Sequence, residues 1–141
     1  MREIKYRAFK KTNTPEMFND LAFIDFKNRE IGINYRISFL AHRIDVEDIN
    51  NVVLMQFTGL KDKNGVEIYE GDIVRVCDGV DSYVTDVYFG GEEYPAFDLN
   101  YEHIPGMWFY ESNVLSTINN TDTEEIEVIG NIYENLELLG G

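Results

Sequence analysis

The sequence predicts a mainly β protein, and three observations support this fold class. Short segments rich in β-branched and aromatic residues recur along the 141 residues, and Gly, Asn and Asp separate them. A hydrophobic content of 44% and an aromatic content of 13% are enough for a globular core. The length fits one domain, or one domain with a substantial extension, which is stable without disulfides or a structural metal. We therefore expect short strands arranged as a small β-barrel or a sandwich, with little helix.

The first third of the chain contains two clear strand patterns. Residues 4–9 alternate apolar and basic side chains, and a polar turn follows at residues 10–15. Residues 31–39 alternate just as regularly, which again predicts a strand. Asp45 begins either a short helix, as its N-cap, or a loop.

From residue 51 onward the strand pattern becomes sharper. Asn64-Gly65 is a strong short-range turn signal, and Glu70-Gly71-Asp72 predicts a second tight turn. We interpret Gly59, Gly65 and Gly71 as positions of chain reversal that need unusual φ values, and Asp62 and Asp72 as acceptors of backbone N–H groups in these turns. Asn131 lies beside Gly130, where its amide could bond the backbone or close a bulge. The expected strands are 52–57, 66–69, 73–76, 83–89, 107–110 and 126–133, with a terminal turn of helix at 135–139.

The charges are distributed unevenly along the sequence. All 12 Lys and Arg lie in residues 1–75, where 12 acidic residues balance them. Residues 76–141 contain 14 acidic residues and neither Lys nor Arg, so the net charge of −14 belongs to this part. Such a surface repels nucleic-acid phosphates and attracts basic surfaces, although surface carboxylates also serve solubility alone.

The residue patterns of common catalytic and cofactor sites are missing. His42 and His103 have no second ligand at metal-binding spacing, the single Cys77 is followed by an anionic Asp78, and no phosphate-binding or dinucleotide motif occurs. We expect no catalytic residues, no cofactor and no metal. The longest uncharged run, residues 49–60, is too short to span a membrane, and the charged first residues do not resemble a signal peptide. We expect a cytoplasmic protein that does not bind membranes.

The segment between Gly90 and Val114 is rich in aromatic residues and contains two prolines. Its rings either fill the mouth of a small barrel or bind a ligand on a long irregular connection. If the segment binds, the neighbouring carboxylates favour a basic or peptidic partner. The candidate partner-binding residues are Asp86, Glu92, Glu93, Tyr94, Phe97, Asp98, Tyr101 and Trp108.

Four stretches together resemble the YopX-like proteins of bacteriophages and prophages. They are MREIKYRA (1–8), MQFTGLKDKNG (55–65), IYEGDIV (68–74) and VIGNIYEN (128–135). The resemblance covers most of the chain; Lys10 departs from it, since an acidic residue is expected after the aromatic Phe9. It implies an SH3-like small barrel over residues 53–141, preceded by a β-rich extension over residues 1–52, and a bacterial host cell. It carries over no catalytic residue.

Two main classes of function follow, and an enzyme with an unrecognised carboxylate site, which would require a pocket holding carboxylates of raised pKa, is a third possibility. The first is a non-enzymatic interaction module that binds a host or phage protein through its acidic C-terminal half. The alternative is a nucleic-acid-binding barrel that uses the basic residues of the first eleven positions, which the overall charge disfavours. Self-association is a separate expectation, because an uncovered sheet edge in the N-terminal extension can pair with a second copy.

Overall fold

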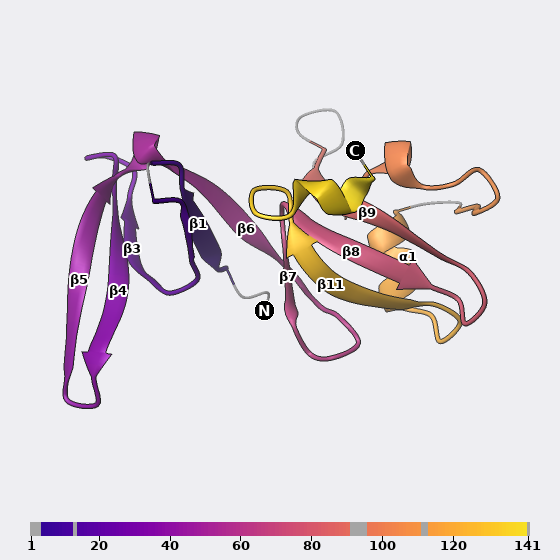
Figure 1. Cartoon of the computed structure of the whole chain (residues 1–141), viewed down its shortest axis with the longest axis horizontal. Coiled ribbons are helices and arrows are strands. Elements are labelled where there is room, and N and C mark those ends of the chain that lie inside the picture. The colour runs from indigo at the N-terminus through magenta and orange to yellow at the C-terminus, as the bar shows by residue number, and fades with distance from the viewer. Residues whose placement is uncertain (1–3, 13, 91–95, 111–112, 141) are drawn as a thin grey trace. The chain divides into compact units, whose positions relative to one another are not determined.

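The computed structural model describes residues 4–12, 14–90, 96–110 and 113–140 (Figure 1). The chain divides into two compact units, which we call the N-terminal unit (residues 4–56) and the C-terminal unit (residues 57–140). Strand β6 (Val52–Lys61) passes from one unit into the other. The sequence predicted an extension that ends at residue 52 and a barrel domain that begins at residue 53. Whether these two parts fold as separate domains stays a prediction.

The N-terminal unit contains two antiparallel sheets. In the first, β1 (Tyr6–Lys10) lies between β2 (Glu16–Phe18) and the start of β6. In the second, β4 (Glu30–Ser38) lies between β3 (Leu21–Asp25) and β5 (Ala41–Asp48), and a 3-10 turn, η1 (Ile49–Asn51), leads from β5 into β6. A shared core joins the sheets through Ala8, Phe18, Ile31, Ile33 and Val52.

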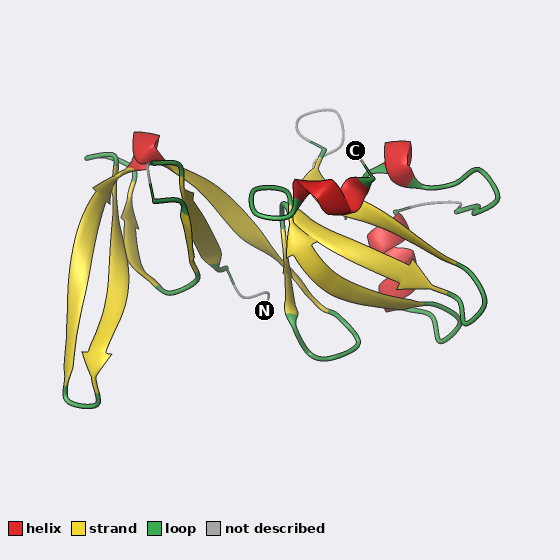
Figure 2. Ribbon diagram, viewed as in Figure 1, coloured by secondary structure: helices red, strands yellow, loops and turns green. Residues whose placement is uncertain are grey.

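The C-terminal unit is built on a sheet with the order β10-β9-β8-β11. Its strands are β8 (Asp72–Cys77), β9 (Ser82–Phe89), β10 (Phe97–Leu99) and β11 (Glu125–Asn131), and β7 (Glu67–Tyr69) pairs with the end of β6. Helix α1 (Val114–Asn119) places Val114, Leu115 and Ile118 in the core with the apolar residues of β8 and β9 (Figure 2). Two 3-10 turns, η2 (Tyr101–His103) and η3 (Leu136–Leu139), both pack against β9.

This architecture confirms the predicted fold class. The chain is mainly β with one short α-helix, and its antiparallel sheet curls into a half barrel. The turn chemistry is also confirmed at Gly65 and Gly71, whose φ angles are 81° and 87°. Gly59 has a φ of 90° but lies inside β6, where the register with β7 shifts, so it bends a strand and does not reverse the chain. Within the described residues, no helix is long and apolar enough to cross a membrane.

Two further local predictions were wrong, and one helix was missed. Residues 107–110 form no strand: Trp108 and Tyr110 pack on the core from an irregular connection, whereas Phe109 is 83% exposed. Asp45 begins neither a helix nor a loop: it lies within β5, and the cap is Asp48, whose carboxylate accepts from the Asn50 N–H at 2.8 Å. Helix α1 was not predicted, since six residues are too few to show a helical period.

Candidate functional site

The candidate partner-binding residues lie around β9, β10 and the connection from β10 to α1. The structure describes Asp86, Phe97, Asp98, Tyr101 and Trp108. The other three, Glu92, Glu93 and Tyr94, lie outside the described residues. The five described residues lie in the same part of the C-terminal unit, but their side chains differ in how far they are exposed to solvent.

Asp98 is completely buried and has a structural role. One carboxylate oxygen accepts three backbone N–H groups: that of Leu99 at 2.8 Å, that of Val114 at 2.9 Å and that of Leu115 at 3.1 Å. The last two open α1, so Asp98 supplies acceptors that a helix start lacks. Its other oxygen is buried and has no hydrogen-bond partner among the residues that the structure describes. A residue without solvent exposure cannot contact a docking protein, and we leave Asp98 out of the surface proposed below.

Asp86 holds the η2 turn against β9. Its carboxylate accepts from the side-chain amide of Asn100 at 3.2 Å and lies 3.7 Å from the Nε2 atom of His103. Asn100 caps η2 by accepting from the Glu102 N–H at 3.0 Å. Asp86 is partly exposed, while Tyr101 and Glu102 on the turn are exposed. The arrangement presents the Tyr101 ring and the Glu102 carboxylate at the surface, whereas the Asp86 side chain is only 13% exposed.

The aromatic residues divide into packed and exposed sets. Trp108 meets Tyr83 edge to face with ring centroids 4.8 Å apart, and Phe97 packs on Phe89 at 5.2 Å. Phe97 and Trp108 both pack on the core of the C-terminal unit, which favours the interpretation that these rings fill the barrel. Tyr101, in contrast, is half exposed.

A chain of hydrogen bonds lies beside Trp108. The hydroxyl groups of Tyr83 and Tyr110 are 2.9 Å apart, and the Tyr110 hydroxyl donates to Glu124 at 2.9 Å. Burial raises the pKa of Tyr83 to about 12. Burial also raises the pKa of Tyr110, and its hydrogen bonds to Tyr83 and Glu124 raise it further. Both hydroxyls are therefore kept neutral, which suits packing and not proton transfer at neutral pH.

Because the pKa values of Tyr83 and Tyr110 are raised in the folded protein, we expect it to lose stability at alkaline pH. An unfolded tyrosine ionises near pH 10, so the stabilisation from Tyr83 is complete below pH 10 and is lost as the pH rises to about 12. We expect the free energy of unfolding in urea to fall by about 2 kcal/mol over this interval. In the variant Tyr83→Phe, the free energy of unfolding should fall less steeply between pH 10 and pH 12. An unchanged slope in this variant would contradict a raised pKa at Tyr83 as the cause.

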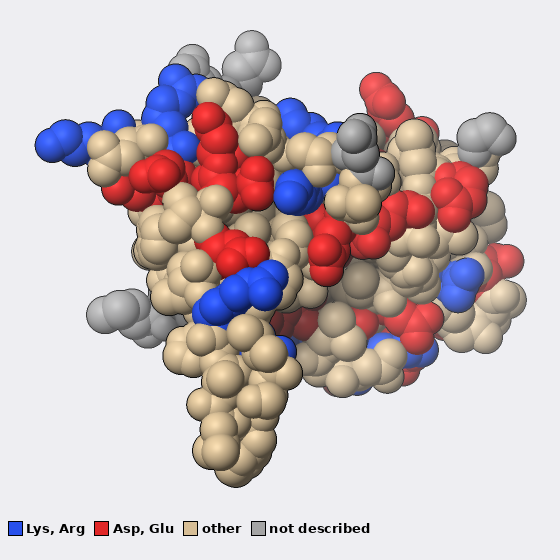
Figure 3. Space-filling model, turned by 60° about the vertical axis from the view of Figure 1, so that its left-hand side comes forward, with Lys and Arg blue, Asp and Glu red and all other residues tan. Residues whose placement is uncertain are grey.

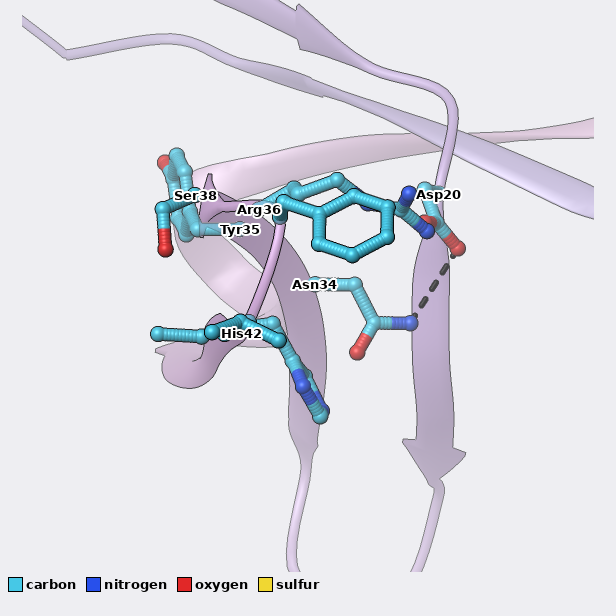
Figure 4. Close-up of a pocket in the computed structure, with 9 residues that line it drawn as sticks. Asp20, Asn34, Tyr35, Arg36, Ser38 and His42 are labelled. Carbon is cyan, nitrogen blue, oxygen red and sulfur yellow. Dashed lines mark hydrogen bonds between the residues drawn. The ribbon is translucent and has the colours of Figure 1, made fainter.

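The remaining candidate features are in the N-terminal unit. A pocket of about 360 Å³ lies at the hairpin of β4 and β5, where Asp20 accepts from the Asn34 amide at 3.1 Å beside Arg36 and His42 (Figure 4). Its side chains were not among the sequence candidates, since only the fold of the hairpin brings them together. Within the described ranges, no three His, Cys, Asp or Glu residues gather where they could hold a metal ion.

The basic segment is partly used inside the fold. Arg7 is buried and donates to the Met55 sulfur at 3.6 Å, while Lys10 forms an ion pair with Glu47 at 3.4 Å. Two of the basic residues on which nucleic-acid binding would depend therefore have partners in the N-terminal unit.

Comparison with known proteins places this fold in a family. The model of the YopX protein family matches residues 5–140. The crystal structure of protein EF1440 from Enterococcus faecalis is similar at 29% identity, with 99% of both chains covered and a TM-score of 0.63. Protein yopX from Bacillus subtilis shares the fold at 24% identity, with 98% of both chains covered and a TM-score of 0.56. The curated proteins gave no match. With nearly its whole length matched, the chain belongs to the YopX family.

Proposed function

We propose that this YopX-family chain is a non-enzymatic interaction module that binds a basic surface of a host or bacteriophage protein in the bacterial cytoplasm. The observation that carries the proposal is the charge of residues 76–141, which contain 14 acidic residues and no Lys or Arg. Complementary charge accelerates the encounter of two proteins and selects between partners.

Several of these carboxylates are exposed on one part of the C-terminal unit. Glu102 belongs to η2 and Glu137 to η3, both turns pack against β9, and both side chains are exposed. Asp86 lies on β9 itself, and Tyr101 adds an exposed ring next to Glu102. Figure 3 shows one face of the molecule, on which Asp and Glu side chains alternate with Lys and Arg. We define the acidic face as Asp86, Tyr101, Glu102 and Glu137.

The test is charge reversal at the acidic face with a matched control elsewhere. The double variant Glu102→Lys with Glu137→Lys should lose capture of the partner from a nuclease-treated bacterial lysate, read by mass spectrometry. The control reverses Asp81, on the turn between β8 and β9, and Asp122, on the turn between α1 and β11, which are also exposed. Both variants change the net charge equally, so net charge alone cannot explain a difference.

Release of one stoichiometric protein from the unmodified chain at moderate salt, with loss only in the first variant, would support the proposal, because screening weakens exposed charge contacts. Equal capture by both variants would overturn it. A partner that is nucleic acid, recovered without nuclease treatment, would favour the alternative use of the basic segment. The buried Arg7 and the paired Lys10 argue against that alternative.

A further inference from the structure

Strand β5 forms one edge of its sheet. It pairs with β4 on one side, and in the described part of the chain no strand pairs with its other side (Figure 1). Ile44 and Val46, on the face away from the core, are 47% and 55% exposed. An exposed edge strand with apolar side chains is a template for pairing with another strand, and proteins that avoid such pairing cover or interrupt the edge.

The direction of the backbone groups on β5 follows from the ladder. The Ile49 N–H donates to the Arg29 carbonyl at 2.9 Å, in the same register as the β4–β5 pairing. Hydrogen-bonded pairs alternate along an antiparallel ladder, so Arg43, Asp45 and Glu47 bond to β4. His42, Ile44 and Val46 therefore direct their N–H and C=O groups to the open edge.

The charges of β5 are complementary to those of a second β5. In an antiparallel pair centred on Ile44, each Arg43 lies opposite the Asp45 of the other copy, and the two Ile44 side chains meet at the two-fold axis. Val46 lies opposite His42. No two like charges are directly opposite in this register. Its hydrogen bonds are made by His42, Ile44 and Val46, the residues whose backbone groups face the open edge. Within one chain, Arg43 Nε lies 2.8 Å from Asp45 Oδ1, and the Arg43 guanidinium lies over the Tyr35 ring of β4 at 4.8 Å, so dimer formation would redirect this charge toward the other copy.

The same arrangement accounts for the apolar hairpin end. Phe39 and Leu40, at the turn between β4 and β5, are 96% and 90% exposed. This end is the uncharged projection at the bottom of Figure 3. Antiparallel pairing brings it to the base of the partner's β5, next to Ile49. A lipid surface is the weaker candidate for these side chains, because the net charge of −14 opposes binding to anionic membranes.

We propose that two copies of this chain form a two-fold dimer by antiparallel pairing of their β5 strands, with Ile44 at the axis and Arg43 opposite Asp45 of the other copy. Backbone hydrogen bonds between the two Ile44 residues, and between His42 and Val46 on either side, join the two three-stranded sheets into one of six strands. Strand β5 belongs to the N-terminal unit and the acidic face to the C-terminal unit, so a variant of one surface changes no residue of the other.

The first experiment measures mass against concentration by sedimentation equilibrium and light scattering. The unmodified chain should show a monomer–dimer equilibrium, and a monomer mass at the highest soluble concentration would overturn the proposal. Arg43→Asp and Asp45→Arg each place two like charges opposite each other, and each should raise the dimer dissociation constant at least about tenfold. Mixing these two variants should restore a dimer, since every charged pair is then complementary. If both variants dimerise like the unmodified chain, the dimer does not form through β5 and the proposal is overturned.

A cross-linking experiment tests the register. In a Cys77→Ser background, which removes the single native thiol, Ile44→Cys should form a disulfide-linked dimer with oxidised glutathione, because opposite Cα atoms lie within disulfide distance. Val46→Cys is the matched control: its two copies are four residues out of register, so it should stay unlinked. Equal cross-linking of both variants, or of neither, would overturn the pairing. The Lys variants of Glu102 and Glu137 should leave the dimer intact, which separates this proposal from the proposed function.

Discussion

Asp98→Ala is expected to lower the free energy of unfolding by about 3 kcal/mol, because it leaves buried N–H groups without an acceptor. Asp98 is fully buried, and one of its oxygens accepts from Leu99, Val114 and Leu115. Alanine removes all three bonds and also opens a small void where α1 begins. Urea unfolding followed by circular dichroism measures the change.

Two comparisons make this result specific. Asp98→Asn keeps an oxygen acceptor, so it should cost clearly less than alanine. Asp86→Ala, at a partly exposed carboxylate on the neighbouring strand, should cost under about 1 kcal/mol. A loss for Asp98→Ala no larger than that for Asp86→Ala would show that the bonds to α1 contribute little.

Asp62→Ala should have an effect of similar size, because this nearly buried carboxylate joins two distant parts of the C-terminal unit. One oxygen accepts from the backbone of Asn64 at 2.8 Å and Val66 at 2.9 Å, which closes the turn between β6 and β7. The other accepts from the Val128 N–H at 2.9 Å, on β11. We expect a loss of about 3 kcal/mol in urea unfolding.

Amide hydrogen exchange identifies which of these bonds matters. Asp62→Asn keeps an acceptor for the turn but can present an NH₂ group to Val128, so exchange at Val128 should accelerate while Asn64 and Val66 stay protected. Unchanged protection of Val128 in both Asp62 variants would contradict the link to β11.

The turns were predictable from the sequence because their chemistry is local. Gly65 and Gly71 adopt the positive φ values that their positions require, and Asp62 and Asp72 accept backbone N–H groups, in the case of Asp72 from Tyr69 at 2.7 Å. Asn131 likewise accepts from the Tyr133 and Glu134 N–H groups, beside the register shift of β11. Each of these devices involves residues only a few positions apart, apart from the contact of Asp62 with Val128.

What the sequence could not reveal depends on contacts between distant residues. The start of helix α1 is held by Asp98, whose carboxylate accepts from the N–H group of Val114, 16 positions later. The helix is too short to show a helical period in the sequence. Trp108 belongs to an aromatic run that resembles a strand, yet it packs against Tyr83 without joining the ladder. The structural role of Asp98 was missed for the same reason. A carboxylate in an acidic segment is expected to be exposed, and only the fold shows the backbone N–H groups to which it is bonded.

The candidate site divides along the same line. The concentration of negative charge after residue 75 can be counted from the sequence alone. That η2 and η3 bring Glu102 and Glu137 to the same strand requires the fold. The sequence predicted an uncovered sheet edge in the N-terminal extension but could not assign it to β5, because residues 45–49 resemble a helix start or a loop until the pairing with β4 shows residues 45–48 to be strand.

The bond between Asp62 and Val128 also sets an order of events during protein synthesis. Its two partners are 66 positions apart, so at about 5–20 residues per second the ribosome adds Val128 roughly 3–13 s after Asp62. Every strand that pairs within residues 4–56 has been translated well before β11. The whole sequence of β5, the strand for which the dimer is proposed, is therefore synthesised while the core of the C-terminal unit still lacks a strand.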